Sequence, residues 1–219
     1  MKKENRKDIL LAAGLLAAFL LWTAAVLTVD VQPIGPHGSA VGFSALNGFF
    51  HRLTGVNMTL YIITDWLGLV PIGVAGSFGC LGLMQWISRR SIRHVDASLF
   101  VLGGFYIIVI AAYLFFECVV VNYRPVLIDG ILEASYPSST TLLVLCVMPT
   151  AGLQLRGRIH SRRIRQGILA AVTVFTSFMV IGRLLSGVHW VSDIIGGALL
   201  STGLVLMYYS ACRRLRKNP

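Results

Sequence analysis

Charged residues are scarce in this chain of 219 residues, and acidic ones are fewer than basic ones. Aspartate and glutamate number nine, against 19 lysines and arginines, and charged residues make up 13% of the sequence. A soluble domain carries close to a quarter charged residues. Hydrophobic residues account for 56%, and the mean hydropathy is +0.75. The composition therefore excludes an ordinary soluble domain and predicts an integral membrane protein.

The chain also has few residues suited to metal binding or to covalent cross-links. Its four cysteines, Cys80, Cys118, Cys146 and Cys212, lie in or beside apolar stretches, without CxxC or CxxH spacing. Isolated cysteines in such stretches behave as small buried hydrophobic residues. We therefore expect no disulfide framework, no metal site and no cofactor.

Long apolar stretches separate the charged ones. Residues 9–29 contain no charged residue and would extend about 31 Å as a helix, enough to cross a bilayer. A cleaved signal peptide is the alternative, but the stretch is long for one and further spans follow, so we expect a retained helix. The further segments are 58–87, 99–121, 137–155, 166–185 and 188–211. The predicted fold is all-α: a six-span transmembrane bundle in one domain, residues 1–219.

The basic residues predict how this bundle is oriented. Sixteen of the 19 lysines and arginines fall in the termini and in the second-to-third and fourth-to-fifth connections, all on one side of a six-span bundle. By the positive-inside rule this side, with both termini, is cytoplasmic. Only Arg52, Arg124 and Arg183 fall on the other side. The net charge of +10 thus indicates topology and some attraction to anionic lipid, not nucleic-acid binding.

Ionisable residues between the fifth and sixth spans form the first candidate site. Arg183, His189 and Asp193 fall within eleven residues there, where charged groups are costly and usually functional. His189 and Asp193 share one face if the segment is helical, so the carboxylate could orient the imidazole as a nucleophile. Arg183 adds donors suited to phosphate or carboxylate oxygens. The alternative is a buried ion pair that only joins two helices.

Two other segments converge on the same outer side in this topology. Arg124 follows the third span, and residues 137–141 (Pro-Ser-Ser-Thr-Thr) begin the fourth with capping hydroxyls and free backbone donors. Two arginines, a helix N-terminus and an oriented histidine make an anion site with a nucleophile. Phosphoryl transfer depends mostly on positioning and charge stabilisation. The sequence thus predicts phosphoryl transfer through a phosphohistidine, at the extracytoplasmic face of the cell membrane.

The three segments together resemble a known signature. Arg124-Pro125, then Pro137-Ser138-Ser139, then Gly182-Arg183 followed by His189 and Asp193 are similar to the three motifs of the type 2 phosphatidic acid phosphatase family. This is a family of membrane lipid phosphatases related to vanadium haloperoxidases. The resemblance covers roughly residues 58–212, which would form a phosphatase-like core.

The resemblance implies a role for each motif residue. His189 would be the nucleophile and Asp193 its orienting partner. Arg124 and Arg183 would hold the phosphate. The residues at the helix start that would bind its oxygens are Ser138, Ser139 and Thr140. The substrate would be a phosphorylated lipid in the bilayer.

Two positions depart from the family pattern. A lysine usually precedes the Arg of Arg-Pro by seven residues, where this chain has Glu117, and a general-acid histidine usually ends the second motif, where it has Thr140. Losing a general acid typically costs about 10²–10⁴-fold. A lipid alcohol, with a pKa near that of water at about 16, needs this acid. A lipid diphosphate leaves as a phosphomonoester with a second pKa of about 6. We therefore expect isoprenoid or other lipid diphosphates to be preferred over phosphatidate-like monoesters.

Several alternatives stay open at this point. Glu117 or Glu133 could replace the missing acid, since burial can raise the pKa of a carboxyl group; the other interpretation of Glu117 is a helix-end carboxylate paired with an arginine. The protein could instead be a pseudoenzyme that only binds lipid phosphates. It could also be a transporter of phospholipid or another anion, for which inverted repeats would be the sign, and none is visible.

Overall fold

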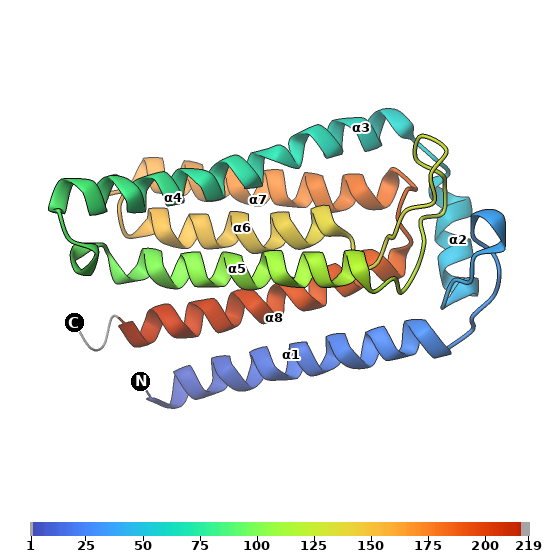
Figure 1. The fold of residues 1–219 in the computed structure, drawn as a ribbon, viewed down its shortest axis with the longest axis horizontal. Coiled ribbons are helices and arrows are strands. Elements are labelled where there is room, and N and C mark those ends of the chain that lie inside the picture. The colour runs from blue at the N-terminus through green and yellow to red at the C-terminus, as the bar shows by residue number, and fades with distance from the viewer. Residues whose placement is uncertain (1, 216–219) are drawn as a thin grey trace.

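The regular secondary structure is helical throughout the part of the chain that the structure, a computed structural model, describes: residues 2–215, with side chains for 5–215. The helices are α1 (Lys2–Thr28), η1 (Pro36–Gly38), α2 (Ser44–Thr54), α3 (Met58–Leu67), α4 (Leu69–Arg89), η2 (Ile92–His94), α5 (Ala97–Cys118), α6 (Ser139–Arg156), α7 (Arg162–Leu185) and α8 (Val191–Leu215). The long helices lie side by side in one bundle, and α2 lies at one end of it (Figure 1). The predicted all-α fold is confirmed.

Among the described residues, five segments are long and apolar enough to cross a membrane, one fewer than predicted. They are Asn5–Thr28, Met58–Arg89, Ala97–Cys118, Arg162–Leu185 and Val191–Leu215. The predicted span that is missing from this set is α6, which packs against α4, α5, α7 and α8. Protein rather than lipid surrounds α6, so polar side chains on this helix can find hydrogen-bond partners. Thr150 and Gln154 are buried there, and Gln154 Nε2 donates to the hydroxyl of Tyr208 at 2.6 Å.

The outward surfaces of α1, α4, α5 and α7 are apolar. Leu21 of α1 is 73% exposed and Val174 of α7 is 70% exposed, and many apolar side chains on the same helices are similarly exposed. An apolar surface of this extent would make a protein aggregate in water, whereas it suits the hydrocarbon of a bilayer. The chain is a multi-pass membrane protein.

The second predicted segment is two helices, α3 and α4, separated at Gly68. The backbone N–H of Asn57, just before α3, donates to the carbonyl of Ser186 at 2.9 Å. Further along α3, buried Thr64 lies against Gly182 of α7, where an added Cβ would lie 2.8 Å from its methyl group. The short helix α3 is therefore docked on the last turns of α7.

The two ends of the bundle differ in their connections. α1 begins and α8 ends at one end, beside the α4–α5 connection (Figure 1). The arginines of the α4–α5 and α6–α7 connections lie at this end, whereas the side chains of Lys2 and Lys3 and all of Arg216 and Lys217 fall outside the described part. The other end holds α2, the α5–α6 loop and the α7–α8 connection, from which the predicted site residues come.

The first helix, α1, packs along α8 and reaches the loops at that second end. The Trp22 indole N–H donates to the carbonyl of Ser192 at 3.1 Å, and the hydroxyls of Thr23 and Tyr136 are 2.7 Å apart. The ring of Phe19 stacks on that of Tyr136, with 6.3 Å between centroids. Helix α1 therefore supports both the start of α8 and the loop that leads into α6.

The turn between α7 and α8 depends on Gly187, and we predict that Gly187→Ala is destabilising. Gly187 has φ +68°, and an added Cβ would lie 1.9 Å from the carbonyl oxygen of Gly55. The left-handed backbone and the clash should together cost about 2–4 kcal/mol. Thermal unfolding in detergent should show a lower midpoint. Gly104→Ala is the matched control, because nothing lies within 4 Å of its added Cβ. Equal midpoints for Gly187→Ala and the native chain would contradict this prediction.

Candidate active site

The site residues predicted from the sequence lie together at the end of the bundle that holds α2. Arg124 comes from the α5–α6 loop, and Arg183 from the last turn of α7. His189 lies in the α7–α8 connection, and Asp193 in the first turn of α8. The α5–α6 loop and the stretch from the end of α7 to the start of α8 thus contribute to one buried cluster of polar side chains.

His189 lies between two membrane-spanning helices, and its contacts identify its protonation state. Its Nε2 is 3.2 Å from Nη1 of Arg124. Because a guanidinium only donates hydrogen bonds, Nε2 accepts, and the proton of the neutral imidazole is on Nδ1. Burial, followed by the positive charges of Arg124 and Arg183, holds the pKa of His189 well below its usual value. The imidazole is therefore neutral near pH 7, with a lone pair on Nε2.

Asp193 lies on the Nδ1 side of His189. Its Oδ2 is 3.7 Å from Nδ1, which is longer than a hydrogen bond. The carboxylate is fully buried, and Oδ2 accepts the backbone N–H of Trp190 at 3.0 Å, as in a helix-capping box. The shared helix face considered for the pair does not form, because α8 begins at Val191 and His189 precedes it. The cap at the start of α8 brings Asp193 next to His189 instead.

Two asparagines that the sequence analysis did not single out hold Asp193 and its helix in place. Nδ2 of Asn122 lies 3.4 Å from Oδ1 of Asp193. Asn47 of α2 accepts the backbone N–H of Ser192 at 3.1 Å and donates to the Ser192 hydroxyl at 2.9 Å. Both asparagines are buried, where an amide needs partners for its donors and acceptors. Their only sequence signal was a polar side chain in a mostly apolar chain.

Arg183 is almost completely buried, and its guanidinium is only partly satisfied. Nη2 donates to Oδ1 of Asp65 at 2.7 Å and to Oγ1 of Thr140 at 2.5 Å. Nε and Nη1 are buried without a hydrogen-bond partner in the described part of the chain. Unpaired buried donors are costly, so this guanidinium is suited to an anionic ligand. The Thr140 hydroxyl accepts a hydrogen bond from this guanidinium, so it is already engaged at the start of α6.

Tyr61 of α3 lies against both arginines and was missed by the sequence analysis. The guanidinium carbon of Arg183 is 5.0 Å from the centroid of its ring, and that of Arg124 is 5.9 Å away. Both distances are within the range of cation–π attraction. Tyr61 and Asp65 are four residues apart on α3, so the same helix face holds both guanidinium groups. The break at Gly68, which gives α3 its own direction, was not evident in the apolar sequence.

The start of α6 uses its polar residues in different ways. Ser138 is the N-cap: its hydroxyl accepts the backbone N–H of Thr141 at 3.5 Å, and its own N–H donates to the carbonyl of Asp193 at 3.2 Å. Ser139 instead lines a cavity beside His189. Of the three residues expected to bind phosphate oxygens, Ser139 alone borders this cavity.

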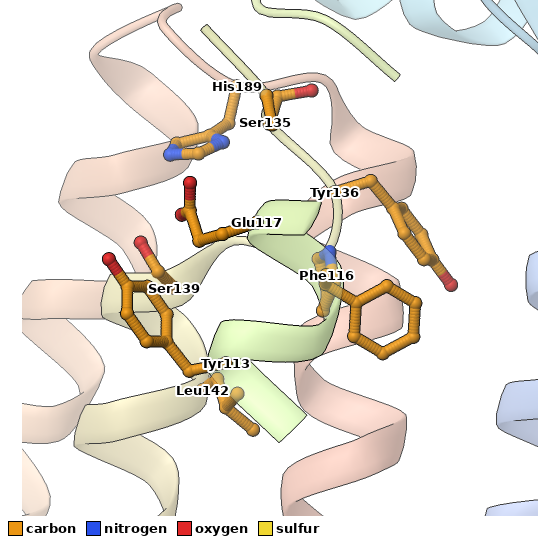
Figure 2. Close-up of a pocket in the computed structure, with 10 residues that line it drawn as sticks. Tyr113, Phe116, Glu117, Ser135, Tyr136, Ser139, Leu142 and His189 are labelled. Carbon is orange, nitrogen blue, oxygen red and sulfur yellow. The ribbon is translucent and has the colours of Figure 1, made fainter. Parts of the chain in front are cut away.

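The cavity beside His189 has room for about one water molecule. Figure 2 shows the side chains around it, and the lining residues are Tyr113, Phe116, Glu117, Ala134, Ser135, Tyr136, Pro137, Ser139, Leu142 and His189. Glu117 extends from the last turn of α5, and its carboxylate points toward the imidazole (Figure 2). A carboxylate and a neutral imidazole thus border the same small space.

The two glutamates considered as substitutes for an acid have different surroundings. Oε2 of Glu133 is 2.9 Å from Nε of Arg124, and the Glu133 carbonyl accepts the Arg124 backbone N–H at 3.0 Å. Glu117 forms no ion pair within residues 5–215, so the arginine pairing considered for it does not occur there. Glu133 is engaged with an arginine, whereas Glu117 is available to the cavity.

Comparison with known families decides the relationship that the motifs suggested. The model of the PAP2 superfamily matches residues 39–217. The chain belongs to the PAP2 superfamily. This is the type 2 phosphatidic acid phosphatase family, so the resemblance in the three motifs is confirmed.

A solved structure has a similar fold. It is the crystal structure of a transmembrane PAP2 type phosphatidylglycerolphosphate phosphatase from Bacillus subtilis, with 19% sequence identity and a TM-score of 0.53. The alignment covers 94% of this chain and 96% of that one. At this identity the similarity shows that the PAP2 fold is shared along nearly the whole chain. The comparison with curated proteins found no significant match.

We predict that Tyr61→Leu weakens binding of inorganic phosphate. Loss of the ring that contacts Arg124 and Arg183 should raise the dissociation constant by about 2- to 30-fold, given about 0.5–2 kcal/mol for a cation–π contact. Isothermal titration calorimetry measures this directly. Tyr61→Phe should bind nearly as the native chain does, since the ring is kept.

The matched control for this prediction is Tyr209→Leu. The Tyr209 ring lies 5.5 Å from the guanidinium carbon of Arg213, a contact of the same kind at the opposite end of the bundle. Its loss should leave phosphate binding unchanged. An equal effect of Tyr61→Leu and Tyr209→Leu would show that the ring at position 61 has no specific role.

Proposed function

We propose that this PAP2 superfamily chain is a membrane lipid phosphatase or diphosphatase that acts through a phosphohistidine on His189. The observation that supports this most strongly is the neutral, buried imidazole between a guanidinium at Nε2 and a carboxylate near Nδ1. A neutral imidazole with its proton on Nδ1 has the Nε2 lone pair that attack on phosphorus requires. Membership in the PAP2 superfamily supports the same reaction class.

The two arginines bind the phosphoryl group in this proposal. Nε and Nη1 of Arg183 are buried donors without a hydrogen-bond partner among residues 5–215, and they suit two oxygens of one phosphoryl group. Arg124 now lies against Nε2 of His189, so a phosphoryl group that enters between them replaces this contact. Ser139 lines the cavity on another side of His189, and from there its hydroxyl donates to a phosphoryl oxygen. Ser138 and Thr140 act indirectly, through the helix cap and through Arg183.

The first chemical step is an in-line attack by Nε2 of His189 on the terminal phosphorus. The N–P bond forms, and the bond from phosphorus to the leaving oxygen breaks, with its electrons passing to the leaving group. The imidazole then carries a positive charge, which Asp193 stabilises through Nδ1. The arginines stabilise the charge on the phosphoryl oxygens in the transition state. A shift of a few tenths of an ångström would convert the 3.7 Å separation of Nδ1 and Oδ2 into a hydrogen bond.

The leaving group determines the substrate class. Thr140 occupies the position expected for a general acid, and its hydroxyl accepts a hydrogen bond from Arg183. A site without this acid favours a leaving group that departs as a stable anion. A lipid monophosphate, with a second pKa of about 6, meets this condition, and a lipid alcohol does not. The favoured substrate is therefore an isoprenoid or other lipid diphosphate.

The proposed topology has six spans, of which α6 is the central one, with both termini in the cytoplasm. The basic connections at the end opposite the site support this orientation under the positive-inside rule. Residues 1–219 form one domain, with residues 58–212 as the phosphatase core. The active site then faces the extracytoplasmic side of the cell membrane.

We predict that His189→Ala reduces phosphate release from farnesyl diphosphate by about 10³-fold or more. The native protein, incubated with substrate labelled in its terminal phosphoryl group, should acquire an alkali-stable, acid-labile label on His189. His160→Ala is the matched control, since His160 lies in the exposed connection between α6 and α7. It should release phosphate at the native rate.

If the native protein turns over substrate and the His189→Ala variant retains this activity, the mechanism is contradicted. The absence of turnover in the native protein, together with binding of the lipid diphosphate, would favour the second candidate, a pseudoenzyme that binds lipid phosphates. The bond between Thr140 and Arg183 and the glutamate at position 117 favour this candidate over a transporter.

We predict that lipid diphosphates are hydrolysed faster than lipid monoesters. The value of kcat/KM for farnesyl diphosphate should exceed that for phosphatidylglycerolphosphate, the monoester for which the solved relative is named, by about 10²-fold or more. Purified protein in mixed micelles, assayed with both substrates at equal surface fraction, gives the ratio. Faster hydrolysis of the monoester would show that the site contains an effective general acid.

A further inference from the structure

The need for a catalytic base rests on the proposed function, in which His189 forms a phosphohistidine. Hydrolysis of this phosphohistidine requires a group that accepts a proton. The water that attacks phosphorus has a pKa of about 16 when free, so its proton must pass to a base as the new bond forms. Thr140 does not provide this base, because its hydroxyl is held by Arg183. The first step creates no such need, because the lipid monophosphate leaves without a proton.

Three of the carboxylates near the site are already engaged. Asp65 accepts from Arg183 at 2.7 Å, and Glu133 pairs with Arg124 at 2.9 Å. Asp193 accepts the N–H of Trp190 and lies on the Nδ1 side of His189, away from the atom that binds phosphorus. None of these three borders the cavity beside His189.

Glu117 meets the geometric requirements of a base. It lines the cavity together with His189 and Ser139, and its carboxylate points toward the imidazole (Figure 2). The cavity between them has room for about one water molecule. Within residues 5–215, no arginine or lysine pairs with Glu117, so its carboxylate is available to accept a proton.

We propose that Glu117 is the catalytic base of the second half-reaction. Its carboxylate accepts one proton from the water molecule in the cavity, and the water oxygen forms a bond to phosphorus. The bond between phosphorus and Nε2 of His189 breaks, and its electrons return to the imidazole. Inorganic phosphate leaves, His189 is neutral again, and Glu117 releases its proton to solvent. A base across the cavity from the nucleophile is the arrangement that an in-line displacement needs.

The test is rapid-quench kinetics of Glu117→Gln in the full-length, detergent-solubilised protein. The probe is farnesyl diphosphate labelled in its terminal phosphoryl group, and the reaction is stopped in alkali, where phosphohistidine survives. The variant should form farnesyl monophosphate in a burst of about one equivalent per protein, at the native rate. Labelled His189 should accumulate, and steady-state turnover should fall by about 10²–10⁴-fold. Glu117→Asp, which keeps the carboxylate, should recover part of the turnover.

Asp129→Asn is the matched control, because it makes the same chemical change in the α5–α6 loop. Asp129 has φ +49°, a conformation that asparagine tolerates, and it does not line the cavity. This variant should show native turnover without accumulated phosphohistidine.

The possible results separate the two proposals. Native turnover in Glu117→Gln, or a burst slowed as much as the steady state, would overturn the role of Glu117 as a base. A burst that slows more with poorer leaving groups would show instead that Glu117 acts as the acid of the first step. Turnover that persists in His189→Ala would overturn the proposed phosphohistidine mechanism itself. A Glu117→Gln protein that binds inorganic phosphate with native affinity is folded, so its kinetics report on the chemistry.

Discussion

The contact between Arg124 and Nε2 of His189 is the interaction on which the rest of the site depends. A cation that can only donate forces the imidazole to be neutral and to place its proton on Nδ1. That tautomer places an N–H on the side of Asp193 and leaves the lone pair on Nε2. The second arginine adds to the effect, because its charge also disfavours the imidazolium. The chemistry of the histidine is thus set by its neighbours before any ligand binds.

Two buried arginines near a bilayer need compensation, and short helix α3 supplies much of it. Asp65 pairs with Arg183, and the Tyr61 ring lies against both guanidinium groups. Glu133 compensates Arg124 from the α5–α6 loop. The arginines are buried whereas the two carboxylates are partly exposed, so loss of a carboxylate would leave a buried positive charge without compensation. Within the described part of the chain, these partners nevertheless leave two donors of Arg183, Nε and Nη1, without a hydrogen-bond acceptor.

The sequence predicted the helices and the approximate composition of the site, because hydropathy and charge placement report directly on the bilayer. Arg124, Arg183, His189 and Asp193 could be grouped because alternating spans bring every second connection to one end. The partners of these residues could not be predicted. Tyr61 is one aromatic residue in an apolar helix, and its position depends on the break at Gly68, which has no strong sequence signal.

The remaining differences have the same origin in tertiary packing. Hydropathy placed His189 inside the last span, whereas the cap formed by Asp193 starts the helix two residues later. Hydropathy also treated α6 like the other spans, although helices rather than lipid surround it. The hydrogen-bond partner of Thr140 is Arg183, 43 residues further along the chain, and no local sequence pattern indicates this contact.

The hydrogen bond from Trp22 to the Ser192 carbonyl limits how far the chain can be truncated at its N-terminal end. The PAP2 family model begins at residue 39, after α1 has ended. Yet α1 covers one side of α8 and holds the backbone next to Asp193. A fragment cut to the boundaries of the family model would lose α1, and the carbonyl of Ser192, next to Asp193, would lose its hydrogen-bond donor. The smallest unit able to assemble the site is therefore longer than the segment by which the family is defined.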